Sequence, residues 1–346
     1  MATTPQWLIY RGSGEPHDGL AELPEPPPWR RFDGDPVEGA TTIGPPDGTL
    51  PWEGGAVSSR PGVSERARAY YPSSDVVEMV NAALYLRRPL LVTGKPGTGK
   101  STLAHSVARE LKLGPVLYWP ITSHAKVDDG LYRYDAIGRL QEASLARTAE
   151  PPDVGRYIRL GPLGTALLPR HRPRVLLIDE LDKSDVDLPN DLLNIFEEGQ
   201  FDIPELARLP EEQDSVHVMT RDPGGRAAIR RGQVRCHAFP FVVITSNGER
   251  EFPPPFLRRC LRLNIQPPDA EKLAAIVAGQ LGKAVLDESR QLIEQFVDSR
   301  DHGDLATDQL LNAIYLAASG ARPDAVTKER LVAQLFRPLD RSPGSA

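Results

Sequence analysis

The sequence predicts an α/β domain built on a buried parallel sheet, followed by an all-helical unit. Three observations support this fold class. A glycine-rich loop stands between a short apolar run at 90–92 and a helical pattern. Two further apolar runs, 175–178 and 241–244, each lead into polar side chains, as buried parallel strands do. After Pro267 the apolar residues recur only at helical spacing.

Composition is that of a soluble globular chain of 346 residues, long enough for two folded units. Its net charge is −6, and residues 1–66 hold ten acidic side chains against five arginines, so the rest is nearly neutral. A broad basic surface for nucleic acid is not expected. Cys236 and Cys260 fit neither a disulfide framework nor a zinc site. No secretory leader or membrane-length apolar run is found, so we expect a cytoplasmic protein.

Residues 1–66 are expected to form a largely irregular, acidic arm, because about a third of them are Pro or Gly and apolar periodicity is lacking. Two short aromatic islands, 7–10 and 29–32, interrupt it. They are either ligands for a partner or anchors that pack on the body in cis, and a solvated tail with such anchors is the favoured interpretation. A second disordered segment is expected at 339–346.

The glycine-rich loop has the spacing G-x-x-x-x-G-K-S from Gly94 to Ser101. Glycines let backbone N–H groups turn inward around a polyphosphate. Lys100 can reach the β- and γ-phosphates, and the Ser101 hydroxyl suits Mg²⁺. The following helical pattern would point its N-terminus at the anion. The expected phosphate-binding residues are Gly94, Lys95, Pro96, Gly97, Thr98, Gly99, Lys100, Ser101 and Thr102.

Other elements are expected on both sides of this loop. A helix capped by Ser73 or Ser74 precedes it, and a strand over 116–119 follows. The mixed region 121–142 is either a surface for another subunit or substrate, or a solvated loop. A helix over 189–198 ends at a glycine, and the short apolar stretches of 200–239 predict a β-hairpin insertion.

Polar residues at two strand ends are candidates for chemistry. Asp179 and Glu180 follow a buried apolar strand, at the sheet edge where such folds bind ligands. Asp179 would hold Mg²⁺, and Glu180 would polarise an attacking water. Asn247, after the strand at 241–246, would orient water beside the γ-phosphate, although a polar residue there is more often a turn starter.

The end of the chain begins with a short helix over 256–260, which carries Arg258 and Arg259. These arginines are either solvated or presented to a neighbour's nucleotide. A last strand covers 261–265, and four amphipathic helices are expected between 270 and 336. We therefore expect a nucleotide-binding domain at 67–266 and a helical lid at 267–338.

These motifs as a set resemble the MoxR-like branch of the AAA+ ATPases over about residues 70–336. The resemblance is carried by the loop 94–101, the strand 175–180, the stretch NIFEEGQF at 194–201, the strand ending ITSN and the run PFLRR. It implies an αβα sandwich with strand order 5-1-4-3-2, an inserted hairpin and a helical lid. By position, Asp179 and Glu180 resemble the Walker B pair, and Asn247 resembles sensor 1.

The resemblance also implies ATP and Mg²⁺ as cofactors and a ring, usually hexameric. Arg259, with Arg258 as second choice, resembles the arginine finger that serves the next subunit. The lid departs from the family, since Thr307 or Asp308 stands where an arginine usually touches the γ-phosphate.

The implied activity is ATP hydrolysis coupled to remodelling or activation of a partner protein, with a von Willebrand factor A domain protein as one partner and a bacterial conflict system as one setting. The alternatives are a nucleic-acid motor of restriction type and an ATP-binding switch or scaffold.

Overall fold

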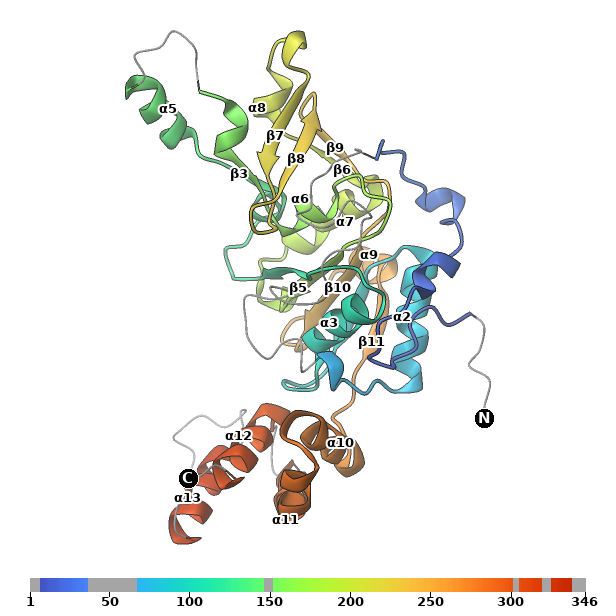
Figure 1. The fold of residues 1–346 in the computed structure, drawn as a ribbon, viewed down its shortest axis with the longest axis vertical. Helices are drawn as coiled ribbons and strands as arrows, with labels where there is room; N and C mark the ends of the chain where they lie inside the picture. The colour runs from blue at the N-terminus through green and yellow to red at the C-terminus, as the bar shows by residue number, and fades with distance from the viewer. Residues whose placement is uncertain (1–6, 37–66, 146–151, 301–304, 319–324, 338–346) are drawn as a thin grey trace.

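Five buried strands form one parallel sheet in the spatial order β11-β1-β10-β5-β2 (Figure 1). The structure, a computed structural model, describes residues 7–36, 67–145, 152–300, 305–318 and 325–337. Numbered along the chain, the strands follow the order 5-1-4-3-2, which confirms the expected sheet. The strands are β1 (Leu90–Thr93), β2 (Leu117–Pro120), β5 (Val175–Asp179), β10 (Phe241–Ser246) and β11 (Leu261–Asn264).

Alternate residues of each strand face two separate cores, because side chains on a strand point to opposite faces. Val175 and Leu177 pack with helices α2 (Ser74–Leu86) and α3 (Lys100–Glu110). Leu176 and Ile178 belong to the other core. That core also takes residues from α6 (Pro162–Ala166), α7 (Leu188–Glu198) and α9 (Pro254–Arg259). Helices therefore cover both faces of the sheet.

A second sheet of six strands stands apart from the first, in the order β3-β4-β7-β8-β9-β6 (Figure 1). The β7–β8 hairpin lies inside the insertion expected at 200–239, but the sheet is larger than a hairpin because β3 and β4 join it. Its strands are β3 (Tyr132–Tyr134), β4 (Ile158–Leu160), β6 (Gln200–Asp202), β7 (Ser215–Met219), β8 (Arg226–Arg230) and β9 (Gln233–Arg235).

The mixed region 121–142 contains regular structure rather than only a loop. Helix α4 (Val127–Leu131) leads into β3, and helix α5 (Ala136–Leu145) projects away from the body (Figure 1). The remaining short elements are η1 (Gly19–Glu22), η2 (Pro28–Arg30), η3 (Val154–Tyr157), η4 (Leu181–Lys183), α8 (Pro204–Ala207) and η5 (Glu211–Gln213).

The described part of the arm, residues 7–36, packs on the body at anchor points such as Ile9, Tyr10 and Arg30, with exposed residues between them. Glu110, fully buried on α3, accepts backbone N–H bonds from Arg11, Gly12 and Gly14. Asn81 on α2 accepts two more from the first aromatic island and donates to the carbonyl of Tyr10. Polar side chains on two helices thus supply the partners that an irregular backbone needs. Residues 37–66 and the tail expected at 339–346 lie outside the described residues.

The C-terminal helices form a separate small bundle below the sheet in Figure 1. Leu273, Phe296 and Leu310 are among the residues of its own apolar core. Its helices are α10 (Ala270–Leu281), α11 (Lys283–Ser299), α12 (Thr307–Ala318) and α13 (Ala325–Leu335). Within the residues that the structure describes, no helix has both the length and the apolar character to cross a membrane.

Candidate functional site

The glycine-rich loop connects β1 to α3 in a conformation that requires its glycines. Gly94, Gly97 and Gly99 all have positive φ, at +148°, +75° and +88°. A Cβ at Gly94 would lie 2.5 Å from the carbonyl oxygen of Ile265, so a side chain cannot fit there. The Thr98 hydroxyl closes the turn by donating to the Lys95 carbonyl at 2.9 Å. This backbone leaves the N-terminus of α3 facing the loop, as anion binding requires.

Lys100 folds back under the loop instead of extending into solvent. Its Nζ donates to the carbonyls of Gly94 at 2.7 Å and Lys95 at 2.9 Å, and to Asn247 Oδ1 at 2.8 Å. Burial lowers the pKa of Lys100, while the carboxylates of Asp182 and its neighbours oppose that shift. The structure thereby joins the loop on β1 to the end of β10 through a single ammonium group.

Asp179, at the end of β5, lies beside Ser101. Its Oδ1 accepts hydrogen bonds from Ser101 Oγ at 2.6 Å and Thr245 Oγ1 at 2.7 Å, and its Oδ2 accepts from Tyr118 OH at 3.2 Å. All three partners are neutral hydroxyls. Among the described residues, no salt bridge reaches this carboxylate. The hydrogen bonds of this carboxylate to described residues thus leave its charge directly unpaired, which suits it to bind a cation in the cavity.

Glu180 is held in place by both its backbone and its side chain. It adopts the left-handed conformation with φ of +62°, which is uncommon for a non-glycine residue and tends to mark functional sites. Its N–H donates to Thr245 Oγ1 at 2.8 Å. Its carboxylate accepts from Lys183 Nζ at 2.7 Å and from Asn247 Nδ2 at 3.4 Å. Glu180 and Asn247 are thus in direct contact.

Asp182 is a supporting residue that the sequence motifs do not single out. It is 4% exposed, and its Oδ2 accepts the backbone N–H groups of Asn247 at 2.8 Å and Glu249 at 3.1 Å. It therefore fixes the turn that carries Asn247. Thr245 and Tyr118, which bond to Asp179, are also not predicted from the sequence, because a single hydroxyl within a strand has no recognisable sequence pattern.

A cavity of about 640 Å³ opens at this edge of the sheet. The glycine-rich loop, Asp179, Glu180 and Asn247 line it, together with Ser101 and Thr102. Apolar and aromatic residues line it as well: Tyr70, Tyr71, Val76, Ile265 and Ile276. Charged and polar groups beside apolar and aromatic side chains are what a nucleotide with its phosphates and base requires.

The lid touches the glycine-rich loop directly. A Cβ at Gly97 would lie 2.6 Å from Ala306 Cβ and 2.7 Å from the backbone nitrogen of Thr307. Thr307 and Asp308 both line the large cavity, so the lid places an acidic residue there. Only a glycine at position 97 permits this close approach.

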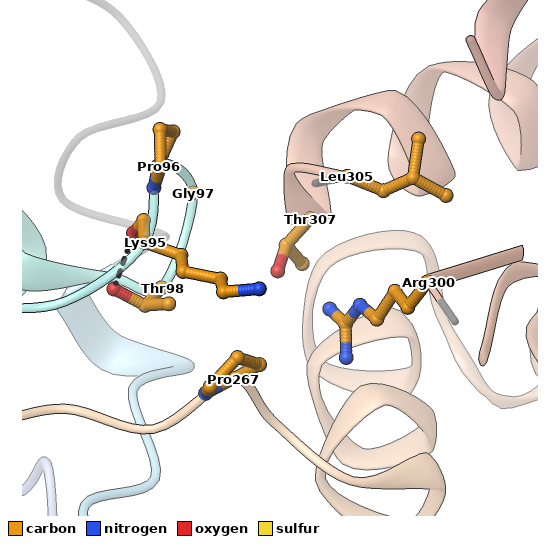
Figure 2. A pocket seen from close by; sticks show the side chains of 8 residues that line it. All are labelled: Lys95, Pro96, Gly97, Thr98, Pro267, Arg300, Leu305 and Thr307. Carbon is orange, nitrogen blue, oxygen red and sulfur yellow. Dashed lines mark hydrogen bonds between the residues drawn. The ribbon is translucent and has the colours of Figure 1, made fainter. Parts of the chain in front are cut away.

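A lid arginine does reach the loop, but from the end of α11. Arg300 lines a small cavity of about 50 Å³ together with Lys95, Thr98 and Thr307. Figure 2 shows the Thr307 hydroxyl and the charged ends of Lys95 and Arg300 pointing into the same gap. Arg300 also donates to the Pro268 carbonyl at 2.6 Å and stacks on Phe296. No sequence motif indicates Arg300, because a single arginine at the end of a helix has no recognisable pattern.

Arg258 and Arg259 do not join this site. They precede β11, whereas the cavity lies past the other end of that strand, where Asn264 lines it. Arg259 instead donates from Nε to Glu197 Oε1 at 3.0 Å, and Arg258 is exposed. All other predicted site residues lie at one edge of the sheet, and these two arginines lie away from it.

The oxygen donors at the site suit Mg²⁺ rather than a transition metal. Ser101 Oγ and Asp179 Oδ1 are hard ligands 2.6 Å apart. Mg²⁺ keeps several waters and completes its shell with substrate phosphates, so one carboxylate and one hydroxyl suffice. No group of three or more His, Cys, Asp or Glu side chains that could hold a metal occurs in the described part of the chain.

Comparison with known proteins agrees with this geometry. The model of the AAA domain (dynein-related subfamily) matches residues 89–260. The chain is 26% identical over 274 residues to the chaperone protein ClpB of Chlamydia trachomatis serovar D, covering 75% of this chain and 29% of the relative. It is 29% identical over 162 residues to ClpB 1 of a Nostoc species, covering 43% and 17%.

The chain thus spans less than a third of the length of these curated relatives. The domain match covers four of the five sheet strands, from β1 to β10, and ends just before β11. Strand order, the helices on both faces and the helical C-terminal region agree with it. Together, the domain match and the architecture support an AAA+ ATPase with an AAA+ α/β fold.

Proposed function

We propose that the chain hydrolyses ATP as a subunit of a ring, in the manner of a MoxR-like ATPase, and uses the energy to remodel or activate a partner protein. One observation carries the ATPase proposal. Lys100, Ser101, Asp179 and Asn247 come from three segments far apart in sequence and are joined by hydrogen bonds of 2.6 to 2.8 Å.

Mg²⁺ would be held by Ser101 and Asp179, and it would supply positive charge to the β- and γ-phosphate oxygens. Lys100 would bind the same phosphates, since its ammonium already lies inside the loop, hydrogen-bonded to the carbonyl of Gly94. The backbone N–H groups of the loop would hold the phosphates in place. These groups fix the phosphates before reaction, which is how phosphoryl transfer is mainly accelerated.

Glu180 would orient the attacking water. Its carboxylate is held between Lys183 and Asn247, and it lines the same cavity as Lys100. Asn247 would place the water from the other side, and its own amide oxygen is bonded to Lys100. An arginine from a second copy, Arg259 by position, would complete the charge balance.

The ring and the protein client are supported by resemblance and by the relatives' printed name. The name "chaperone protein" belongs to the curated relatives, and MoxR-like proteins are expected to work as rings, usually hexamers. The placement of Arg259 away from its own cavity favours action across a subunit interface. A von Willebrand factor A domain protein is the partner class that the family resemblance suggests.

Phosphate release by the purified chain tests the proposal, with ATP and Mg²⁺ over a range of protein concentrations. Turnover per subunit should fall on dilution below the assembly concentration, because each site needs a neighbour's arginine. Glu180→Gln should bind ATP with little change in affinity and hydrolyse it at least about 100-fold more slowly. Full hydrolysis by Glu180→Gln, or a constant rate from a proven monomer, would contradict the proposal.

The alternative of a nucleic-acid motor is tested in the same assay. Duplex and single-stranded DNA are added at several salt concentrations, since an electrostatic effector loses its influence as salt rises. Our proposal expects no stimulation at any salt concentration. A DNA-stimulated rate that falls with salt would favour the motor.

A further inference from the structure

Glu197, at the end of α7, joins two arginines from distant parts of the chain. Its Oε1 accepts from Arg259 Nε at 3.0 Å, and its Oε2 lies 3.8 Å from Arg30 Nη1. Arg30 belongs to the N-terminal arm, and Arg259 ends α9. The two arginines interact with different oxygens, so the carboxylate can pair with both at the same time.

Arg30 is fixed much more firmly than an ordinary surface arginine. It is 6% exposed, and it donates to the carbonyls of Arg87 at 2.8 and 3.1 Å and Phe196 at 3.0 Å. Its guanidinium stacks on Phe32 and Phe239, with centroid distances of 5.1 and 4.6 Å. Burial lowers the pKa of Arg30, and Glu197 opposes that shift as its anionic neighbour. The arm therefore presents a rigid positive charge to Glu197.

Arg259 meets Glu197 through Nε only. Among the residues that the structure describes, neither of its terminal nitrogens has a hydrogen-bond partner. A contact through Nε fixes the plane of the guanidinium and leaves the two NH₂ groups available for phosphate oxygens. The side chain is 37% exposed, so another molecule can reach it.

The charge on this surface fits the opposite charge of a nucleotide site. Two more arginines, Arg88 and Arg258, lie near the Arg259–Glu197 pair, and Arg88 donates to the Arg258 carbonyl at 3.5 Å. The cavity described above is lined by two acidic residues, Asp179 and Glu180, and a bound triphosphate would add negative charge. A second copy of this chain is therefore the partner whose charge complements this arginine-rich surface.

We propose that Glu197, held by Arg30 of the arm, is a positioning residue that orients Arg259 toward the nucleotide of a second copy. The inference rests on the proposed role of Arg259 as the finger. It makes the N-terminal arm part of the hydrolytic apparatus of the neighbouring subunit, because arm docking fixes the carboxylate that aims the finger.

The variant Glu197→Gln tests the inference first, because Glu197 is 49% exposed and its loss should not disturb folding. Its kcat should fall about tenfold, since a misplaced catalytic group loses between ten- and a hundredfold, while the KM for ATP stays within about twofold. Arg30→Met should lower kcat about threefold with the same unchanged KM, and Arg30→Lys should recover part of the loss.

Arg31→Met is the matched control, because Arg31 follows Arg30 and is exposed. It should keep the kcat of the unchanged protein. A fall in kcat for Arg31→Met equal to that of Arg30→Met would overturn the inference, since any loss of positive charge on the arm would then suffice. A rise in KM for Glu197→Gln with unchanged kcat would also overturn it.

Mixing subunits decides whether the effect crosses the interface. Glu180→Gln subunits lack hydrolysis but keep an intact Glu197 and Arg259. When added in excess to Glu197→Gln subunits, they should raise the turnover of each Glu197→Gln subunit several-fold, toward that of the unchanged protein. Unchanged turnover on mixing would place the effect of Glu197 within its own subunit and overturn the proposal.

The variant Arg259→Ala separates failure of this inference from failure of the proposed function. A finger is worth about 10³-fold or more, so Arg259→Ala should be nearly inactive. If it is inactive while Glu197→Gln has normal kcat, the positioning role is wrong and the finger remains. If Arg259→Ala itself hydrolyses normally while Glu180→Gln does not, the finger assignment is wrong.

Discussion

Strand β5 begins just after Arg174 and ends in Asp179, and the two ends treat charge in opposite ways. At the first end, Arg174 is 3% exposed and makes a bidentate pair with Asp222 at 2.8 and 2.9 Å, which Arg170 joins at 3.7 Å. At the other end, the carboxylate of Asp179 has only neutral hydroxyls as hydrogen-bond partners among the described residues, and it faces a cavity.

The difference separates structural from functional charge. A buried charge that meets its counter-ion within the chain supports the fold and has nothing further to bind. A carboxylate whose described hydrogen-bond partners are all neutral can instead bind a cation that enters the cavity. By this criterion the Arg174 end of β5 has only a structural role, and we call it the closed end. The Asp179 end of β5 is a ligand site, and we call it the open end.

The largest expected effect is on catalysis at the open end. Asp179→Asn keeps the size of the side chain and removes its charge, so hydrolysis should fall about 1,000-fold as metal-dependent charge stabilisation is lost. The melting temperature should change by only a few degrees, because Asp179 forms no salt bridge with any residue that the structure describes. Steady-state phosphate release and a thermal melt of the same sample measure both. Unfolding of Asp179→Asn would instead make this end structural.

The next effect is on stability at the closed end. Asp222→Asn removes the negative charge that Arg174 and Arg170 share and should lower the free energy of unfolding by about 3 kcal/mol. Hydrolysis per folded subunit should be nearly unchanged, since these residues do not line the cavity. Denaturant unfolding of the two proteins measures the difference. A loss of activity without a loss of stability would reverse the comparison.

The stability lost in Asp222→Asn should depend on pH. Burial alone raises the pKa of Asp222, but the two arginines outweigh it and hold the pKa below its usual range. A depressed pKa adds stability above the unfolded value of about 3.9, and that stability disappears as pH falls through the folded pKa. The difference between the two proteins should therefore be full at pH 7 and narrow below about pH 4. A difference independent of pH would exclude the ion pair as its cause.

The open end was largely predictable from sequence, and the closed end was not. The motif ending at Ser101 and the apolar run ending at Asp179 identify both residues, because each lies next to a strong local pattern. Asn247 is predicted in the same way, because it directly follows the apolar run of β10. A parallel sheet then brings the ends of its strands to one edge without further information.

The closed end depends on a contact between residues 48 positions apart, and Asp222 lies in a turn whose sequence says nothing of Arg174. The arm is similar, because Glu110 is an unremarkable helix residue until three arm N–H groups bond to it. The second sheet was underestimated because β3, β4, β6 and β9 are three residues each, too short for a clear alternation.

Thr245 connects the open end to β10 and should give a smaller effect. Its hydroxyl donates to Asp179 and accepts from the Glu180 N–H, and the residue is 1% exposed. Thr245→Val keeps the shape and removes the acceptor of that part-buried N–H, which should cost about 1 kcal/mol of unfolding free energy and lower kcat several-fold. Thr245→Ser, which keeps the hydroxyl, is the matched control and should retain kcat. Equal losses in both variants would point to the methyl group instead.

The smallest effect is expected where the lid touches the open end. Gly97→Ala places a methyl group 2.6 Å from Ala306 Cβ at a φ of +75°, so the backbone strain should cost about 1 kcal/mol and the lid must shift. Nucleotide affinity, measured with a fluorescent ATP analogue, should fall several-fold, because Thr307 and Asp308 line the same cavity.

Gly248→Ala is the matched control for Gly97→Ala, because Gly248 has a φ of +82° and no atom lies within 4 Å of its added Cβ. Gly248→Ala should lose a similar amount of stability through backbone strain and should bind the ATP analogue with normal affinity. A normal affinity for Gly97→Ala as well would mean that the lid contact plays no part in binding, and the open end would then be complete without the lid.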